Sequence, residues 1–306
     1  MVYFILFVGI LFAATGGEFF VRGSIGVAAW IRIPSGIVGS TIAAFATSSP
    51  ELSVSVVSAN DGKPEIALGS ALGSNIANIC LIFAIAILLL PMRTSKKELK
   101  RDLPFAITAP IVIGLFGLDG TITRLDGLII IVFFATWLSI TIAQTLKKRS
   151  DSVQVLGEES HGKSLLQGSL GLVLLVLAGF LIVYAAEEIG GILSWNPFLV
   201  GATLVALGTS TPELATTVVA RIKGHDELGV GTVIGSNIFN ALLVVGCAAL
   251  IQPISIDNKA EFLTGVGFGV FSMMLIIPGA KSLLGRQRAV ALLLLYGVYL
   301  FLVINL

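Results

Sequence analysis

The segment GSTIAAFATSSPELSVSVV, from Gly39 to Val57, is the most informative part of this chain because the chain contains it twice. The second copy, GATLVALGTSTPELATTVV, runs from Gly201 to Val219, which is a shift of 162 residues (201 minus 39). Each copy places a Pro-Glu pair inside an otherwise apolar run. Carboxylates are costly in hydrocarbon, so a duplicated carboxylate in such a run indicates a functional site.

A second pair of segments continues in the same register. GSALGSNIAN begins at Gly69 and GTVIGSNIFN begins at Gly231. The polar positions match without a gap: Ser74 with Ser236, Asn75 with Asn237, and Asn78 with Asn240. A duplication that only built a larger bundle would not explain why the best-matched residues are polar. A repeated unit that carries carboxylates is typical of the two halves of a transporter.

The composition predicts an all-α integral membrane protein. Hydrophobic residues make up 56% of the chain and charged residues 12%, whereas soluble domains carry about 25% charge. Ten apolar stretches approach the length that crosses roughly 30 Å of hydrocarbon. They lie near 2–21, 36–59, 65–91, 104–118, 127–146, 166–190, 197–220, 228–251, 262–280 and 288–305. The first lacks a basic segment before it and a clear cleavage site, so it is predicted to be retained rather than removed as a signal peptide.

The ten stretches divide into two groups of five. Residues 1–149 form a first repeat with motifs at 39–59 and 69–78, and residues 166–306 form a second with motifs at 201–219 and 231–240. A polar linker at 150–165 joins them. Five spans separate the two copies of each motif, and an odd number makes the second copy enter the membrane from the opposite side. The sequence therefore predicts two inverted-topology repeats.

Basic residues in the loops predict the orientation. Fifteen lysines and arginines fall in loops on one side, against Lys63, Arg124 and Lys259 on the other. By the positive-inside rule the linker is cytoplasmic and both termini face outward. The net charge of +1 argues against a nucleic-acid partner, and no obligate protein partner is evident. We expect a multi-pass protein of a prokaryotic plasma membrane.

The acidic helices combine carboxylates with hydroxyls. Helical spacing places the oxygens of one triplet on a single face, and its repeat does the same: Thr47, Ser48 and Glu51, then Thr209, Ser210 and Glu213. Pro50 and Pro212 precede the glutamates and have no backbone N–H to donate. We therefore expect a helix break at each motif and free backbone carbonyls beside it, at Ala46 and Gly208.

The second arm of each motif adds hydroxyls and amides, from Ser74 and Asn78 and from Ser236 and Asn240. The resulting ligand set is all oxygen and suits a hard cation such as Ca²⁺, which accepts six to eight oxygens in flexible geometry. Cys80 and Cys247 lie inside predicted spans without metal-binding spacing. Two carboxylates neutralise either one Ca²⁺ or two Na⁺. Competition for them is a physical basis for exchange.

The doubled pattern G-x-x-x-x-A-x-x-T-S-x-P-E followed by G-S-N-I-x-N resembles the two alpha repeats of the sodium/calcium exchanger family. The resemblance covers nearly the whole chain. It implies that Glu51 and Glu213 are the central ligands, assisted by Thr47, Ser48, Ser74, Thr209, Ser210 and Ser236. The backbone carbonyls of Ala44 and Ala206 would complete the site. Potassium-dependent relatives carry an aspartate where this chain has Asn240, so the resemblance implies potassium independence.

Several alternatives remain open from sequence. The leading hypothesis is a sodium/calcium antiporter without a cofactor, and a proton/calcium antiporter of the same fold is the alternative. A cation channel could use the same glutamates. No Ser-His, Cys-His or HExxH arrangement predicts an enzyme. Glu18, Glu187 and Glu188, near the ends of two predicted spans, either line an access path or extend to the membrane interface, and an Arg22 partner four residues from Glu18 favours the second alternative.

Overall fold

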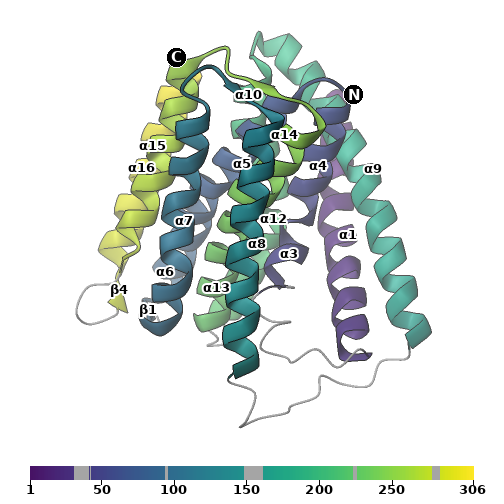
Figure 1. Cartoon of the computed structure of the whole chain (residues 1–306), viewed down its shortest axis with the longest axis vertical. Coiled ribbons are helices and arrows are strands. Elements are labelled where there is room, and N and C mark those ends of the chain that lie inside the picture. The colour runs from purple at the N-terminus through teal and green to yellow at the C-terminus, as the bar shows by residue number, and fades with distance from the viewer. Residues whose placement is uncertain (31–40, 42, 94–95, 148–160, 223–225, 278–282) are drawn as a thin grey trace.

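A computed structural model describes residues 1–30, 41, 43–93, 96–147, 161–222, 226–277 and 283–306. The described chain is almost entirely helical, and both termini lie at the same end of the molecule (Figure 1). Four strands of two residues each are the exception: β1 (Met92–Arg93) pairs with β4 (Leu283–Leu284), and β2 (Thr121–Ile122) with β3 (Ile254–Ser255). The expected all-α architecture is confirmed, with these short antiparallel pairs between loops.

The helices follow the expected order in both halves. The first half contains α1 (Val2–Trp30), α3 (Ala43–Thr47), α4 (Ser49–Asn60), α5 (Pro64–Ala77), the π-helical segment η2 (Asn78–Phe83), α6 (Ala84–Leu89), α7 (Lys96–Phe116) and α8 (Arg124–Lys147). The second contains α9 (His161–Leu193), α10 (Pro197–Val200), the π-helical η3 (Gly201–Val205), α11 (Ala206–Thr209), α12 (Thr211–Ile222), α13 (Asp226–Ile238), the π-helical η4 (Phe239–Val244), α14 (Val245–Ile251), α15 (Lys259–Leu275) and α16 (Arg286–Asn305).

Within the described residues, six helices are long and apolar enough to cross a membrane, and the bent pair Pro197–Thr209 and Thr211–Val218 makes up to seven. Three of the ten expected spans are absent from this set for local reasons. The α3–α4 pair is short and follows residues outside the described part. α7 begins with the charged run from Lys96 to Asp102. α15 has only 17 residues.

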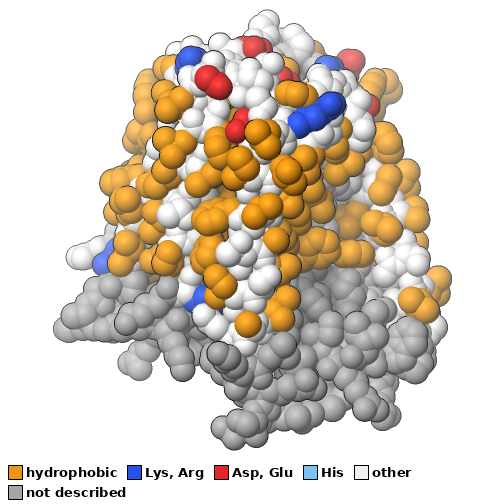
Figure 2. Space-filling model, viewed as in Figure 1, with side chains coloured by type: hydrophobic (Ala, Val, Ile, Leu, Met, Phe, Trp, Pro, Cys, Tyr) orange, Lys and Arg blue, Asp and Glu red, His pale blue; other side chains and the backbone are white. Residues whose placement is uncertain are grey.

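Burial separates central helices from peripheral ones. In the spans Pro64–Leu89 and Gly229–Ile251, 78% of the most apolar 18-residue stretch is buried inside the protein. The corresponding share is 28% or less in Val2–Phe20, Arg124–Gln144 and Arg286–Asn305. The outer helices turn large apolar side chains outward. Hydrophobic side chains cover the flank of the molecule in Figure 2, and both acidic and basic side chains are visible at the end with the termini. An apolar outer surface around a buried polar motif is the arrangement expected of a protein in a bilayer.

The helices that carry the two acidic motifs end at opposite ends of the molecule. Lys63, just after α4, forms an ion pair with Glu187 at 2.7 Å. Arg221, near the end of α12, donates hydrogen bonds to the carbonyls of Leu90 and Pro91 at 3.0 and 2.7 Å. The continuous pass from α5 to α6 separates Lys63 from Leu90 by 26 helical residues, roughly 40 Å of helix. The two motifs therefore run in opposite directions.

α1 and α9 pack closely beside each other (Figure 1). A Cβ atom added at Gly171 of α9 would lie 2.3 Å from the backbone nitrogen of Phe20, and one added at Gly23 of α1 would lie 2.2 Å from that of Gly168. Only glycine permits such backbone contact. The two helices thus form one tightly packed pair.

The predicted linker lies largely outside the described residues, as do Gly39, Arg32 and His225. One boundary differs from the expectation. α9 begins at His161, five residues before the predicted span at 166, so the polar His-Gly-Lys-Ser segment is helical rather than part of the linker. The apolar stretch marks only the part of a helix that can lie in hydrocarbon, and a helix can extend beyond it.

Candidate cation-binding site

Both acidic motifs contain the predicted helix break. α3 ends at Thr47 and α4 begins at Ser49, while Ser48 between them has φ −87° and ψ 7°. Ser210 takes nearly the same conformation between α11 and α12, with φ −80° and ψ 8°. A proline occupies the first turn of each new helix, where its missing N–H costs nothing. The identical breaks show that the repeated sequence imposes a repeated local structure.

The carbonyl that the second proline frees accepts a side-chain hydrogen bond. Thr211 donates its hydroxyl to the carbonyl of Gly208 at 2.9 Å. The expectation of a free oxygen there is therefore corrected: the threonine that replaces Ser49 of the first repeat supplies the missing donor from its side chain.

Glu51 and Glu213 are both 0% exposed, and each accepts hydrogen bonds from both halves of the chain. Glu51 accepts through Oε1 from Ser210 at 3.3 Å and from Ser74 at 3.5 Å. Glu213 accepts through Oε1 from Ser48 at 3.3 Å and from Ser236 at 3.2 Å. Each serine at a helix break thus reaches the glutamate of the other repeat. The two half-motifs form a single polar cluster.

The second oxygen of each carboxylate has no partner. The Oε2 atoms of Glu51 and Glu213 are buried and accept no hydrogen bond. A buried polar group in this condition costs about 1–3 kcal/mol, more for a charged one. Among the described residues, no group of three or more His, Cys, Asp or Glu side chains could hold a metal ion. The central cluster therefore offers two carboxylates, and its other donors are neutral oxygens. A bound hard cation would satisfy both free oxygens.

Hydroxyls and carbonyls surround the two carboxylates. Thr47 Oγ1 lies 3.1 Å from Ser236 Oγ and also contacts the carbonyl of Ala44 at 3.2 Å. Ser74 donates to the carbonyl of Ala206 at 3.4 Å. Thr209 likewise donates to a carbonyl of its own helix, that of Val205, at 3.0 Å. The cluster therefore includes Ala44, Thr47, Ser48, Glu51, Ser74, Ala206, Ser210, Glu213 and Ser236, with Thr209 turned to its own helix.

Four asparagines extend the cluster between the repeats. Asn75 and Asn237 donate to each other's backbone carbonyls at 3.0 and 2.9 Å, a reciprocal pair across the two halves. Asn78 donates to Asn237 Oδ1 at 3.0 Å, whereas both polar side-chain atoms of Asn240 are buried without a partner. Asn78 and Asn240 lie in the π-helical segments η2 and η4, a type of turn frequent at functional sites.

Asn75 and Asn237 are residues that the sequence analysis did not assign to the site. They stand within the repeated G-S-N-I segment, so their duplication was visible. Their role was not, because an asparagine that bonds a backbone carbonyl of the other repeat cannot be recognised from spacing along one helix.

The outlying glutamates form ion pairs or face outward. Glu18 pairs with Arg22 on the exposed face of α1, as predicted. Glu187 pairs with Lys63, and Glu188 is exposed. A role for these residues in an access path stays a prediction.

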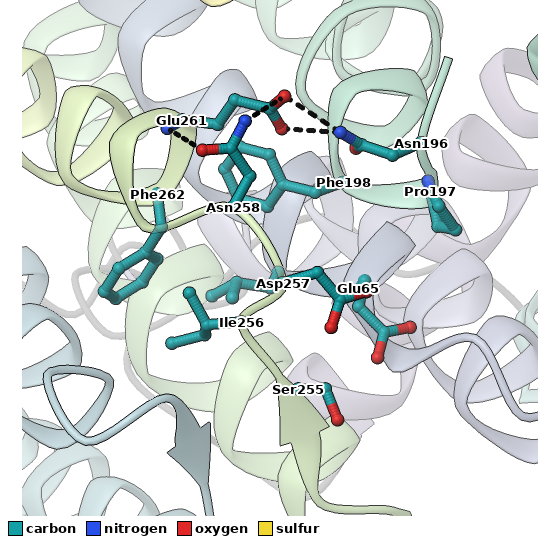
Figure 3. Close-up of a pocket in the computed structure, with 11 residues that line it drawn as sticks. Glu65, Asn196, Pro197, Phe198, Ser255, Ile256, Asp257, Asn258, Glu261 and Phe262 are labelled. Atoms are coloured by element: carbon teal, nitrogen blue, oxygen red, sulfur yellow. Dashed lines mark hydrogen bonds between the residues drawn. The ribbon is translucent and has the colours of Figure 1, made fainter. Parts of the chain in front are cut away.

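A small polar pocket lies at the end of the molecule that carries the termini, away from the central cluster. Its volume is about 20 Å³, near that of one water molecule. Figure 3 shows Glu65 and Asp257 side by side at its edge, while Glu261 is held by Asn196 at 2.8 and 2.9 Å and by Asn258 at 2.8 Å. Asn196 and Asn258 also cap the helices α10 and α15. These bonds tie the two helix starts together.

Comparisons with known proteins identify the family of this chain. The family model "sodium/calcium exchanger protein" matches residues 1–143 and 163–305, once in each half. The chain belongs to the sodium/calcium exchanger family. It is therefore a multi-pass membrane transporter of the cation/calcium exchanger class and not an enzyme.

Individual relatives match over most of their length. A putative antiporter, CaxA, from Alkalimonas amylolytica is 33% identical over 83% of this exchanger and 82% of the relative. The inner membrane protein YrbG of Escherichia coli (strain K12) is 30% identical over 93% and 89%. A solved structure of the sodium-calcium exchanger NCX_Mj, soaked with Na⁺ and Sr²⁺, has a TM-score of 0.67 at 26% identity and covers 97% of this chain and 98% of its own.

Proposed function

We propose that this protein is a secondary antiporter that exchanges Na⁺ for Ca²⁺ through one shared site by alternating access. The observation that carries the proposal is the crosswise cluster in which Ser48 contacts Glu213 and Ser210 contacts Glu51. Each carboxylate keeps one buried oxygen without a partner. One Ca²⁺ or two Na⁺ neutralise the pair, so binding of one species excludes the other at full occupancy.

The ligands in this proposal are the oxygens of Glu51 and Glu213, the hydroxyls of Thr47, Ser48, Ser74, Thr209, Ser210 and Ser236, the amides of Asn78 and Asn240, and the carbonyls of Ala44 and Ala206. Thr209 donates its hydrogen to the Val205 carbonyl, and its oxygen keeps lone pairs that can contact a cation. All are hard oxygen donors, which suit Ca²⁺ and Na⁺. With an amide at Asn240 in place of a third carboxylate, exchange is proposed not to need K⁺.

The architecture in this proposal is ten membrane passes in two inverted five-helix halves. Support comes from the opposite directions of α4 and α12, from the family match in each half and from the position of both termini at one end (Figure 1). The termini are proposed to face outward from the plasma membrane. The α1–α9 pair is proposed to move against the helices that carry the ligands.

A flux experiment tests the proposal. Purified protein is reconstituted into vesicles loaded with Na⁺, and radioactive calcium uptake is followed after dilution into Na⁺-free medium. Parallel vesicles carry K⁺, a proton gradient or no gradient. Uptake that requires internal Na⁺ alone is expected, and Glu51→Gln should abolish it. Uptake driven instead by the proton gradient would replace Na⁺ by H⁺ as the coupling ion.

A further inference from the structure

A second set of buried hydroxyls lies one helical turn beyond the central cluster. On α12, Thr217 follows Glu213 by four residues, and on α13, Thr232 precedes Ser236 by four. Residues four apart share a helix face. Glu213 and Ser236 touch at 3.2 Å, and α12 packs against α13. The two threonines therefore continue the same polar faces toward the end of the molecule at which Arg221 lies.

Neither hydroxyl is satisfied. Thr217 is 0% exposed and Thr232 is 2% exposed, and the hydroxyl oxygen of each has no hydrogen-bond partner. A threonine in a helix normally donates to the carbonyl three or four residues earlier, as Thr136 does to Val132 at 2.8 Å. Two buried threonines on neighbouring helices that forgo this bond each require another polar partner, such as a water molecule or an ion.

In the first repeat, the protein itself supplies a hydrogen-bond partner at one of these two positions. Ser55 is the counterpart of Thr217, and its hydroxyl donates to the carbonyl of Val244 in η4 at 3.1 Å. Ser70, the counterpart of Thr232, is buried without a partner. One of the two positions therefore differs between the halves: the hydroxyl on α4 bonds the other repeat, and that on α12 is free to accept a ligand. Ser70 and Thr232 are alike in having no partner.

We propose that Thr217 and Thr232 form a second coordination step for the transported cation, between Glu213 and the end of the molecule at which α12 ends. The step rests on the proposed function. Two neutral hydroxyls replace part of the hydration shell of Ca²⁺ or Na⁺ without binding the ion tightly. An ion leaving the carboxylates thus meets oxygen ligands before it reaches bulk water. The residues influence the rate of passage and leave equilibrium binding to the central carboxylates.

Calcium self-exchange tests this step without relying on sodium coupling. Vesicles containing the protein are loaded with radioactive calcium, and its release is started by external unlabelled Ca²⁺. Thr217→Val and Thr232→Val keep the side-chain shape and remove the hydroxyl. Each is expected to slow release about fivefold, while equilibrium Ca²⁺ binding to the purified protein changes less than about twofold. Thr217→Ser keeps the hydroxyl and should retain the wild-type rate.

Thr136→Val on the outer face of α8 is the matched control, since its hydroxyl is satisfied within its own helix. Wild-type release rates in both valine variants would overturn the inference, as would loss of rate in proportion to loss of binding. Self-exchange by the wild type without sodium-driven uptake would overturn only the proposed coupling ion. A wild type without calcium exchange of any kind would overturn both proposals.

Discussion

At the scale of single residues, the fold brings most of the positions in the duplicated motif together, and their role as ion ligands stays a prediction. All twelve candidate positions lie in the described chain, and nine of them form the central cluster together. The crosswise pairing of serines with the glutamates of the opposite repeat was beyond prediction, because it depends on how the two halves interleave. The hydrogen bond from the Thr211 hydroxyl to the Gly208 carbonyl was also not predicted. Ser49, at the equivalent position, donates to the carbonyl of Phe45 instead, so the two repeats differ here.

The crosswise pairing predicts equal effects from equivalent serines. Ser48→Ala and Ser210→Ala each remove one hydroxyl from the carboxylate of the other repeat. We expect each to weaken Ca²⁺ binding about fivefold, as the loss of roughly 1 kcal/mol implies. Calorimetric titration of the purified protein measures this. Ser58→Ala is the control, since Ser58 donates only to Ser55 within its own helix. A large effect from one serine and none from the other would contradict the pairing.

The reciprocal asparagine pair predicts a contribution to stability. Asn75→Ala removes the side-chain amide that donates to the backbone carbonyl of Asn237, so this buried carbonyl loses that hydrogen bond. The side-chain amide of Asn237 stays in place. We expect a loss of about 1–3 kcal/mol in the free energy of unfolding, measured as a lower thermal midpoint in detergent. Asn60→Ala is the matched control, because Asn60 is exposed and donates to the carbonyl of Val56 in its own helix. Equal midpoints for the two variants would remove Asn75 from this role.

At the scale of elements, proline predicted the breaks, and the spacing of Gly69 and Gly73 is typical of helices that pack closely. Both breaks fall two residues before the proline, at Ser48 and Ser210. Gly69 and Gly73 do allow close approach, but the contacting elements could not be predicted. They are α10 and η3, where carbonyls of Phe198 and Ala202 lie against the two glycines. The spacing of glycines identifies the face of a helix that another helix can approach closely. It does not identify which helix packs there.

Gly73→Ala tests this contact. The added Cβ would lie 2.3 Å from the carbonyl oxygen of Ala202, which is backbone and cannot rotate away. We expect a destabilisation of about 1–3 kcal/mol or more and a smaller yield of monodisperse protein on size-exclusion chromatography. Gly297→Ala on α16 is the control, because nothing lies within 4 Å of the added atom. A stable Gly73→Ala variant would show that α5 and η3 are farther apart than described.

At the scale of the whole molecule, the repeat and its direction could be predicted because they depend on counting spans. The opposite ends reached by α4 and α12 agree with that count. Among the described residues, six or seven helices are long and apolar enough to cross a membrane, because the α3–α4 pair is broken, α7 begins with charged residues and α15 is short. Ten passes therefore stay part of the proposal.

The orientation of the whole molecule is tested with C-terminal fusions. An outward-facing C-terminus predicts that alkaline phosphatase fused after Leu306 is active, because that enzyme folds only outside the cytoplasm. A green fluorescent protein at the same position should stay dark when exported in unfolded form. Fusions after Lys147 should give the reverse pattern. A fluorescent C-terminal fusion would contradict the charge-based orientation.

Competition between the two ions for one pair of carboxylates is tested most directly by equilibrium calcium binding to the purified protein at increasing Na⁺. We predict that Na⁺ raises the apparent Kd for Ca²⁺ without reducing the number of sites. Glu51→Gln and Glu213→Gln should each weaken binding at least about tenfold, or roughly 1.4 kcal/mol, while the exposed Glu188→Gln leaves it unchanged. Calcium binding that is indifferent to Na⁺, or that survives both central substitutions, would contradict the shared site.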